Sequence, residues 1–171
     1  MPAFKVGDTV VHLTQGSGKV TAVDDKGPPG HPCFYYVVEA NEQTLWIPVE
    51  ETGNPSLHLP TSRADFDLLI KVLRSPGEKF SNNPYQRRDE LDERMHMASP
   101  TDLCLVIRDL THRTRSQKLS NSDIRVLKQA QSYLLDEWER SLGTPREKAK
   151  LEMESILKYQ SASSARSLTR Q

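Results

Sequence analysis

The hydrophobic pattern of this chain changes its period once, close to residue 60, and this change limits the folds open to it. Before it, apolar residues alternate with polar ones in short runs between turn residues; after it, they recur every three or four positions. Alternation is typical of strands, and the longer period is typical of amphipathic helices. The sequence therefore predicts a β domain at residues 1–60 and a helical domain at residues 61–159. The Ser-, Ala- and Arg-rich residues 160–171 are predicted to form a disordered tail.

Four segments of the first domain are predicted strands because they are rich in β-branched and aromatic residues or alternate in polarity. The dipeptide Asn41-Glu42 separates the last two strands and favours a tight hairpin. Strands this short and few do not suffice for a sandwich, so we expect a small Tudor- or SH3-like barrel. The predicted strands are Thr9–Leu13, Lys19–Val23, Phe34–Glu39 and Gln43–Pro48.

The second domain carries start and stop signals for about five helices. Ser or Asn stands at most starts, where its side chain can cap free backbone N–H groups, and Pro often follows. Four of the helices have an apolar face, so we expect a bundle and an α+β fold class for the whole chain. The predicted starts are Ser62, Asn83, Ser99, Ser120 and Thr144, and the predicted stops are Ser75-Pro76-Gly77 and Gly143.

The charge is balanced over the chain, with 23 basic and 23 acidic residues, but it is uneven between the domains. Residues 1–60 hold three basic and seven acidic residues, a net charge of −4, and the rest hold 20 and 16, a net charge of +4. This difference permits modest phosphate contact by the second domain, but taken alone it favours ordinary solvated helices.

Enzyme chemistry and metal binding find no support in the residues. The five histidines are scattered without a metal-binding or nucleophile motif, and Cys33 and Cys104 are isolated from one another. We therefore expect a non-enzymatic protein without cofactor or metal. No apolar run has the length of a membrane span, so we also expect a cytoplasmic protein that does not bind membranes, and nothing in the sequence demands more than a monomer.

The segment Pro84–Met97 departs from the helical pattern, since Leu91 and Met95 are its only regularly spaced apolar residues. Its first turn carries Tyr85, Arg87 and Arg88 beside free backbone N–H groups, whose partial positive charge favours phosphate. These residues are suited to nucleic-acid contact. Four acidic residues follow at 89, 90, 92 and 93 and would repel phosphate, so composition alone favours an ordinary solvated helix over nucleic-acid contact.

Several motifs, taken in order, resemble the CarD/CdnL family of bacterial RNA polymerase-binding transcription regulators. They are Phe4–Val11 (FKVGDTVV), Trp46–Glu50 (WIPVE), Val72–Pro76 (VLRSP), Arg87-Arg88 and Val106–Leu110 (VIRDL). The resemblance extends from about residue 4 to residue 158. It implies a Tudor-like domain that binds the β subunit of RNA polymerase. It also implies a five-helix domain that touches promoter DNA at the upstream edge of the transcription bubble and stabilises the open complex.

The resemblance places the polymerase-binding surface at Lys26, Trp46, Ile47 and Pro48. Lys26 matches a basic residue of the family, whereas Trp46 stands where a second basic residue is common. Strand pairing along Gln43–Ile47 would use backbone hydrogen bonds and tolerate this change. Trp46 is predicted either to face the polymerase or to fill the barrel core, and the sequence favours neither.

On the DNA side, the resemblance aligns Tyr85 with a tryptophan that enters the minor groove. Arg87 and Arg88 match the family pattern, and Arg125 and Lys128 on the fourth predicted helix are candidate phosphate contacts. Glu90 replaces a lysine of the family, so we expect weak DNA binding without sequence specificity, with polymerase supplying most of the recruitment. The alternative function is an adaptor whose helical domain binds another protein instead of DNA.

Overall fold

The computed structural model describes residues 3–49, 57–96 and 98–167, with side chains described through residue 160. The chain divides into two compact units, Met1–Pro60 and Thr61–Gln171. The division falls where the hydrophobic period changes, and each unit has its own core.

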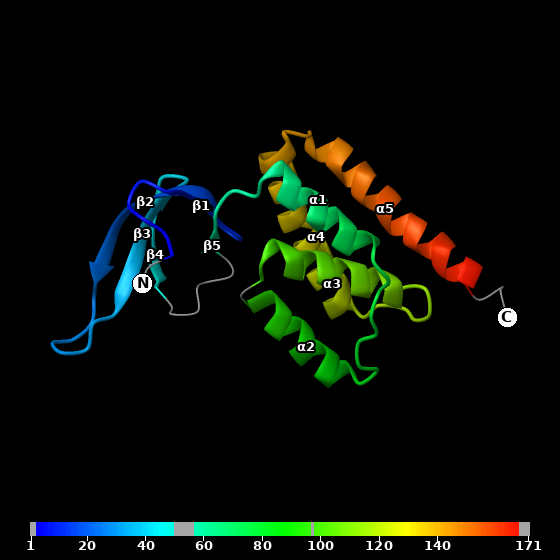
Figure 1. The fold of residues 1–171 in the computed structure, drawn as a ribbon. Helices are drawn as coiled ribbons and strands as arrows, with labels where there is room; N and C mark the ends of the chain where they lie inside the picture. Colours follow the sequence, from blue (N-terminus) through cyan, green and yellow to red (C-terminus); the bar gives the residue numbers. More distant parts are fainter. Residues whose placement is uncertain (1–2, 50–56, 97, 168–171) are drawn as a thin grey trace. The chain divides into compact units, whose positions relative to one another are not determined.

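The first unit is an antiparallel sheet in which the described strands lie in the order β4-β3-β2-β1-β5 (Figure 1). The expected Tudor-like β domain is confirmed. Each of the four predicted strands is present, and β2 begins earlier and runs longer than expected. The strand β5 was not predicted. The strands are β1 (Thr9–His12), β2 (Gly16–Asp25), β3 (Phe34–Ala40), β4 (Gln43–Pro48) and β5 (Leu57–His58).

The β3–β4 hairpin forms as the dipeptide between the strands predicts. Asn41 and Glu42 both have positive φ, 50° and 63°, which is the conformation of a two-residue turn matched to the twist of the strands. The turn pairs Ala40 with Gln43 and, further along, Val37 with Trp46. This register sets which residues of β4 lie opposite β3.

The core of the β unit lies on one face of the sheet. Phe4 packs edge-to-face on Tyr36 with ring centroids 5.4 Å apart, and the Tyr36 hydroxyl accepts a hydrogen bond from the Phe4 backbone N–H. The other members are apolar residues from β1, β2, β3, β4 and β5, because alternate side chains of a strand share one face. They are Val10, Val20, Val38, Ile47 and Leu57.

The second unit contains five described helices, as expected: α1 (Arg63–Arg74), α2 (Pro84–His96), α3 (Pro100–Arg113), α4 (Asn121–Leu142) and α5 (Arg146–Ser167). The predicted caps are confirmed at α1, α3 and α4. Ser62, Ser99 and Ser120 each accept a hydrogen bond from the backbone N–H of the residue three positions on. Gly143 ends α4 with φ 65°, a conformation that glycine adopts without steric cost.

The helix α3 lies among the other helices (Figure 1) and packs against each of the other four. It carries the apolar centre of the bundle. Its Leu103, Val106, Ile107 and Leu110 are fully buried. Nearby, Phe66 of α1 meets Trp138 of α4 edge-to-face at 5.0 Å between ring centroids. Burial raises the pKa of the Cys104 thiol to about 12, which keeps this cysteine protonated and unreactive.

One expectation for the helical unit needs correction. The helix α5 continues to Ser167, so the expected tail does not begin at residue 160; residues 168–171 lie outside the described residues. Gln160 is buried, and its side-chain amide donates to the carbonyl oxygens of Leu73 and Ser75 at the end of α1, which fixes α5 to α1. Within α4, Asp123 takes the inward position and its neighbour Ile124 is exposed.

Candidate functional site

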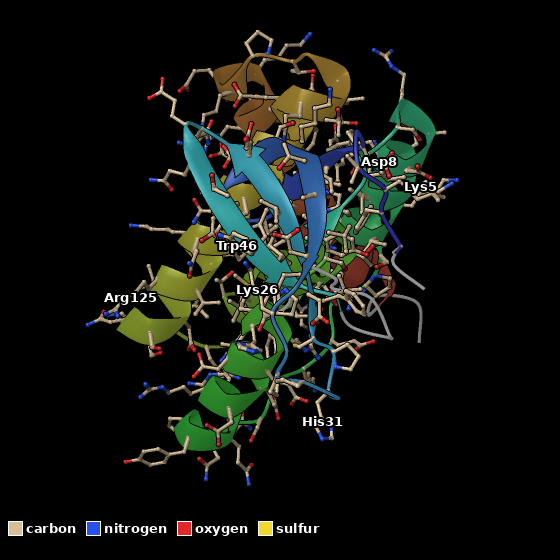
Figure 2. All side chains as sticks on the ribbon, turned by 90° about the vertical axis from the view of Figure 1, so that its left-hand side faces the viewer. Lys5, Asp8, Lys26, His31, Trp46 and Arg125 are labelled. Atoms are coloured by element: carbon tan, nitrogen blue, oxygen red, sulfur yellow. The ribbon has the colours of Figure 1, made fainter. Side chains whose placement is uncertain are left out.

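The candidate surface of the β unit brings Lys26 and Trp46 together. Lys26 follows β2 directly, and its Nζ lies 4.5 Å from the centroid of the Trp46 ring in the middle of β4 (Figure 2). Asp24 lies 3.9 Å from the same ammonium group. Trp46 is 46% exposed and is absent from the core cluster, so the alternative that placed it in the barrel core is wrong. The cation thus covers part of an aromatic ring that solvent still reaches.

The other two candidate residues of this surface have different environments. Pro48 is exposed, but the side chain of Ile47 belongs to the core cluster and cannot reach a partner. The prediction for Ile47 is corrected accordingly: only its backbone is available. Within the described residues β4 pairs with β3 alone and forms an edge of the sheet, and an edge strand offers unpaired backbone groups to an incoming strand.

The start of α2 is closed by its own cap. Asn83 Oδ1 accepts hydrogen bonds from the backbone N–H groups of Tyr85, at 2.9 Å, and Gln86, at 3.3 Å. Pro84 has no N–H group, and the Arg87 N–H donates to the Asn83 carbonyl. The expectation of free N–H groups at this helix end is therefore wrong. Phosphate contact here would depend on side chains and on the helix dipole.

Tyr85 and Arg88 project from the first two turns of α2 into solvent. Tyr85 is 80% exposed, the highest value among the large hydrophobic residues described as exposed. The guanidinium of Arg88 lies 3.7 Å from the Asp92 carboxylate, one turn along the helix, and both side chains are mostly exposed. Such a pair is weak and is easily exchanged for another anion. Both residues are thus accessible to a ligand.

Arg87, in contrast, is buried and only 5% exposed. Its Nε lies 3.2 Å from both carboxylate oxygens of Asp123, at the start of α4. The Arg87 Nη1 group donates to the carbonyl oxygens of Ser81, at 3.0 Å, and Asn82, at 3.4 Å. The prediction that Arg87 contacts phosphate is corrected: its side chain is occupied inside the protein, and only the second arginine of the pair faces solvent.

The two candidate residues on α4 are exposed, as phosphate contacts must be. Arg125 and Lys128 stand two and five residues after Asp123 (Figure 2 labels Arg125), and α4 packs against α2. Asp123 itself was missed as a site residue. The sequence signals it only as the acidic residue of the α4 capping box, three positions after Ser120, and nothing local reveals that its carboxylate also meets Arg87.

Two of the sequence motifs meet in a second polar cluster, around Asp109 of α3. Arg108 Nε lies 2.7 Å from Asp109 Oδ1, and Arg108 Nη1 donates to the Ser75 hydroxyl, so VIRDL is joined to VLRSP. Arg94 of α2 donates to Asp109 Oδ2 at 3.0 Å and also covers the Phe80 ring. This buried cluster holds the loop between α1 and α2 against α3.

Neither a metal centre nor a membrane span emerges from the part of the chain that the structure describes. There, no group of three or more His, Cys, Asp or Glu side chains is arranged to hold a metal ion. None of the described helices combines the length and the hydropathy that crossing a bilayer requires.

Comparison with known families supports both units. The family model described as CarD-like/TRCF RID domain matches residues 4–58. The family model described as CarD, C-terminal domain matches residues 68–154. A protein of Bacillus subtilis (strain 168) with the name "Putative transcription factor YdeB" is 22% identical over 139 residues, which cover 80% of this chain and 90% of that protein.

The two matches follow one another in the same order as the two structural units, and the second alone covers half of the chain. The exposed Lys26–Trp46 pair and the exposed start of α2 lie one in each matched region. The protein belongs to the CarD/CdnL family and is a transcription regulator.

Proposed function

We propose that this regulator binds the β subunit of RNA polymerase through residues 1–60 and stabilises the open promoter complex through its helical unit. In this mechanism the polymerase supplies the affinity that brings the protein to a promoter. The helical unit then touches the upstream edge of the melted DNA without reading its sequence. The observation that carries the proposal is the 80% exposed Tyr85 on the capped first turn of α2, beside the exposed Arg88.

Polymerase binding by the β unit is supported by the shape of its candidate surface. The edge strand β4 provides backbone donors and acceptors for strand pairing, and Trp46 provides a partly covered aromatic surface next to it. Tryptophan is enriched among the residues that dominate protein interfaces. Lys26 adds a hydrogen-bond donor beside this ring, and Asp24 at 3.9 Å offsets its charge.

DNA contact by the helical unit is supported by the combination of an exposed aromatic ring and exposed cations. A tyrosine ring can stack on an unpaired base, a contact worth roughly 1–3 kcal/mol. Arg88, Arg125 and Lys128 can each meet a backbone phosphate. Three phosphate contacts correspond to a salt slope of about −2.7 on a log–log plot, which is characteristic of weak binding. Weak binding agrees with a protein that needs polymerase for recruitment.

The experiment is the lifetime of the open complex on a promoter of the same organism, measured with polymerase and full-length protein. Tyr85→Ala should shorten the lifetime by about 5- to 150-fold if the ring stacks on a base, and Tyr85→Phe should retain most of the effect. Tyr159→Ala is a matched control, because Tyr159 is a tyrosine of α5 that is 75% exposed. Equal lifetimes for Tyr85→Ala and the wild type would remove the ring from the mechanism.

The rival function, an adaptor that joins polymerase to another protein, is favoured by the acidic surface of α2. Asp89, Asp92 and Glu93 are exposed on the same helix as Tyr85. Footprinting of upstream promoter DNA in the presence of polymerase separates the two functions. Protection that depends on Arg88 supports DNA contact. Binding to polymerase without any change in the footprint favours the adaptor.

A further inference from the structure

The helix α2 has little apolar surface with which to hold its position. Within Pro84–His96 the buried residues are Arg87 and Leu91, and Met95 is half-buried. Arg87, Leu91 and Arg94 have the spacing of residues on one helix face. Along this face α2 is held first by the Arg87–Asp123 ion pair, then by the buried Leu91 and then by the Arg94–Asp109 ion pair. Leu91 and the Arg94–Asp109 pair hold its second half. The first half, which carries Tyr85, depends on Arg87.

We infer that the buried Arg87–Asp123 pair is a positioning device, which holds the first turn of α2 and the first turn of α4 in one arrangement so that their exposed residues meet DNA together. Arg87 and Asp123 do not touch DNA. They fix the spacing between Tyr85 and Arg88 on one helix and Arg125 and Lys128 on the other. This inference rests on the function proposed above, because it assigns these two residues a role in the same DNA contact.

The geometry around Arg87 joins three segments through a single guanidinium. Its Nε contacts the Asp123 carboxylate of α4, and its Nη1 contacts the carbonyl oxygens of Ser81 and Asn82 in the loop before α2. These hydrogen bonds have fixed directions, because the donors of a guanidinium lie in one plane. An apolar contact of the same size would allow the helix to rotate or slide. The ion pair does not.

Asp123 is held equally firmly on its own side. Its backbone N–H donates to the Ser120 hydroxyl, and its Oδ2 accepts from the Ser120 backbone N–H, each at 3.1 Å. The carboxylate therefore caps α4 and binds Arg87 at the same time. Any movement of α2 relative to α4 would break the contact with Arg87 or disturb the cap. The two helix starts are consequently linked by one side chain.

The residues next to Arg87 and Asp123 in the sequence are exposed and can contact a ligand. Arg88 follows Arg87 directly, and Tyr85 precedes it by two residues. Arg125 follows Asp123 by two residues. All three are exposed, while the two residues that join the helices are buried. The interior pair can thus set the separation of the surface groups without itself being reached by DNA.

The test compares Arg87→Lys with Arg88→Ala in polymerase–promoter complexes formed with the full-length protein. The measured quantity is the protein concentration that gives half of the maximal open-complex lifetime, determined at several salt concentrations. Lysine keeps the charge of Arg87 but loses its planar set of donors. Arg146→Lys is the matched control, because Arg146 also joins two helices through carboxylates, those of Asp136 and Glu139 on α4, but from the start of α5.

We expect Arg87→Lys to weaken the effect at every salt concentration without changing the salt slope, because no phosphate contact is removed. If the docked arrangement falls to about one tenth of the population, the apparent affinity falls about tenfold. Arg88→Ala should instead reduce the magnitude of the slope by about 0.9, which corresponds to one lost phosphate contact. Arg146→Lys should behave as the wild type in this assay.

Two results would overturn the inference. A slope that falls for Arg87→Lys as it does for Arg88→Ala means that Arg87 reaches phosphate itself. An Arg87→Lys protein that is folded and indistinguishable from the wild type in both affinity and slope means that the pair positions nothing.

Amide hydrogen exchange of the free protein separates this inference from the proposed function. Arg87→Lys should raise exchange at residues 85–88 and 123–124, and Arg146→Lys should not, whether or not DNA is the ligand. Unchanged exchange in Arg87→Lys contradicts the positioning role. Raised exchange, together with no effect of Tyr85→Ala or Arg88→Ala on the open complex, contradicts the DNA function and the positioning role in it, and leaves only a structural link between the helices.

Discussion

Each of the two units exposes one aromatic residue on its candidate surface, but the two residues are supported in different ways. Trp46 lies in the middle of a strand, its position is set by the pairing with Val37, and Lys26 covers part of its ring. Tyr85 stands at the end of a polar helix, and that helix end is held by the buried Arg87–Asp123 pair. Hydrogen bonds between the backbones of β3 and β4 position Trp46, whereas a buried ion pair positions Tyr85.

This difference determines what a substitution near each surface can do. A change at the Lys26–Trp46 pair removes an exposed contact and leaves the hydrogen bonds of the sheet intact. A change at Arg87 or Asp123 leaves an unpaired charge in the interior and removes the support of α2. We therefore expect binding effects alone in the β unit. In the helical unit we expect stability and binding to change together.

The largest effect should follow from removing one member of the buried pair. Asp123→Ala leaves the Arg87 charge buried without a partner and also removes the α4 cap, so we expect the free energy of unfolding of the helical unit to fall by about 3–5 kcal/mol. Urea unfolding followed by circular dichroism at 222 nm measures this, since all the described helices belong to residues 61–171. A loss below about 1 kcal/mol, the level of an exposed pair, would remove the contrast between the units.

The contribution of the Arg87–Asp123 pair to the free energy of unfolding should depend on pH, and this effect should be smaller. Burial alone raises the pKa of Asp123, but hydrogen bonds from Arg87 and Ser120 and the charge of Arg87 outweigh it, so the pKa is lowered. Folding therefore favours the carboxylate. The stability gained is present above the pKa of aspartate in the unfolded chain and is lost as the pH falls through the lower folded pKa.

Asp123→Asn isolates this contribution, because it keeps the size and the hydrogen-bond acceptor but does not titrate. We expect the stability difference between wild type and Asp123→Asn to be largest near neutral pH and to shrink below about pH 4, the usual range of aspartate. Urea unfolding at a series of pH values provides the measurement. A difference that grows in acid contradicts the assigned ion pair.

At the β unit we expect an effect on binding without a change in stability. Trp46→Ala should weaken binding of the full-length protein to the polymerase β subunit by about 2 kcal/mol, roughly 30-fold, if the ring is a dominant contact. Val6→Ala removes another exposed apolar side chain of the same domain and serves as the control. Equal losses of affinity in the two variants would show that Trp46 has no special role.

The smallest expected effect concerns Lys26. Lys26→Met keeps the aliphatic part of the side chain and removes the charge above the Trp46 ring, a contact worth about 0.5–1 kcal/mol at an exposed site. Affinity for the β subunit should fall by about two- to fivefold. A double-mutant cycle with Trp46→Ala tests the connection, because the effect of Lys26→Met should disappear when the ring is absent. Additive losses would mean that Lys26 and Trp46 contact the polymerase independently.

Much of the fold could be predicted because its signals are local. A serine followed three positions later by aspartate marks the starts of α1, α3 and α4, since the capping hydrogen bond joins these same two residues. The β3–β4 turn is specified by two adjacent residues. Tyr85 was correctly expected at the start of a polar helix for the same reason. In each case the interaction lies within a few residues of chain.

The errors concern residues whose partners are distant in the sequence. Arg87 and Arg88 are adjacent and chemically identical, yet they point in different directions, because successive side chains of a helix are rotated by about 100°. Which of the two is buried depends on Asp123, 36 residues away. Gln160, where the tail was expected to begin, is held on α1 by hydrogen bonds to Leu73 and Ser75, more than 80 residues earlier. No local pattern encodes such pairs.

The sequence by itself determined the two domains, the helix ends, the hairpin and the family, because these depend on local hydrogen bonds and on the order of motifs along the chain. The tertiary structure decided which candidate residues are accessible. It placed Trp46 at the surface beside Lys26, Ile47 in the core, and Arg87 in a buried pair with Asp123. Accessibility is a property of packing between distant segments, and packing is settled only when the helices and strands come together.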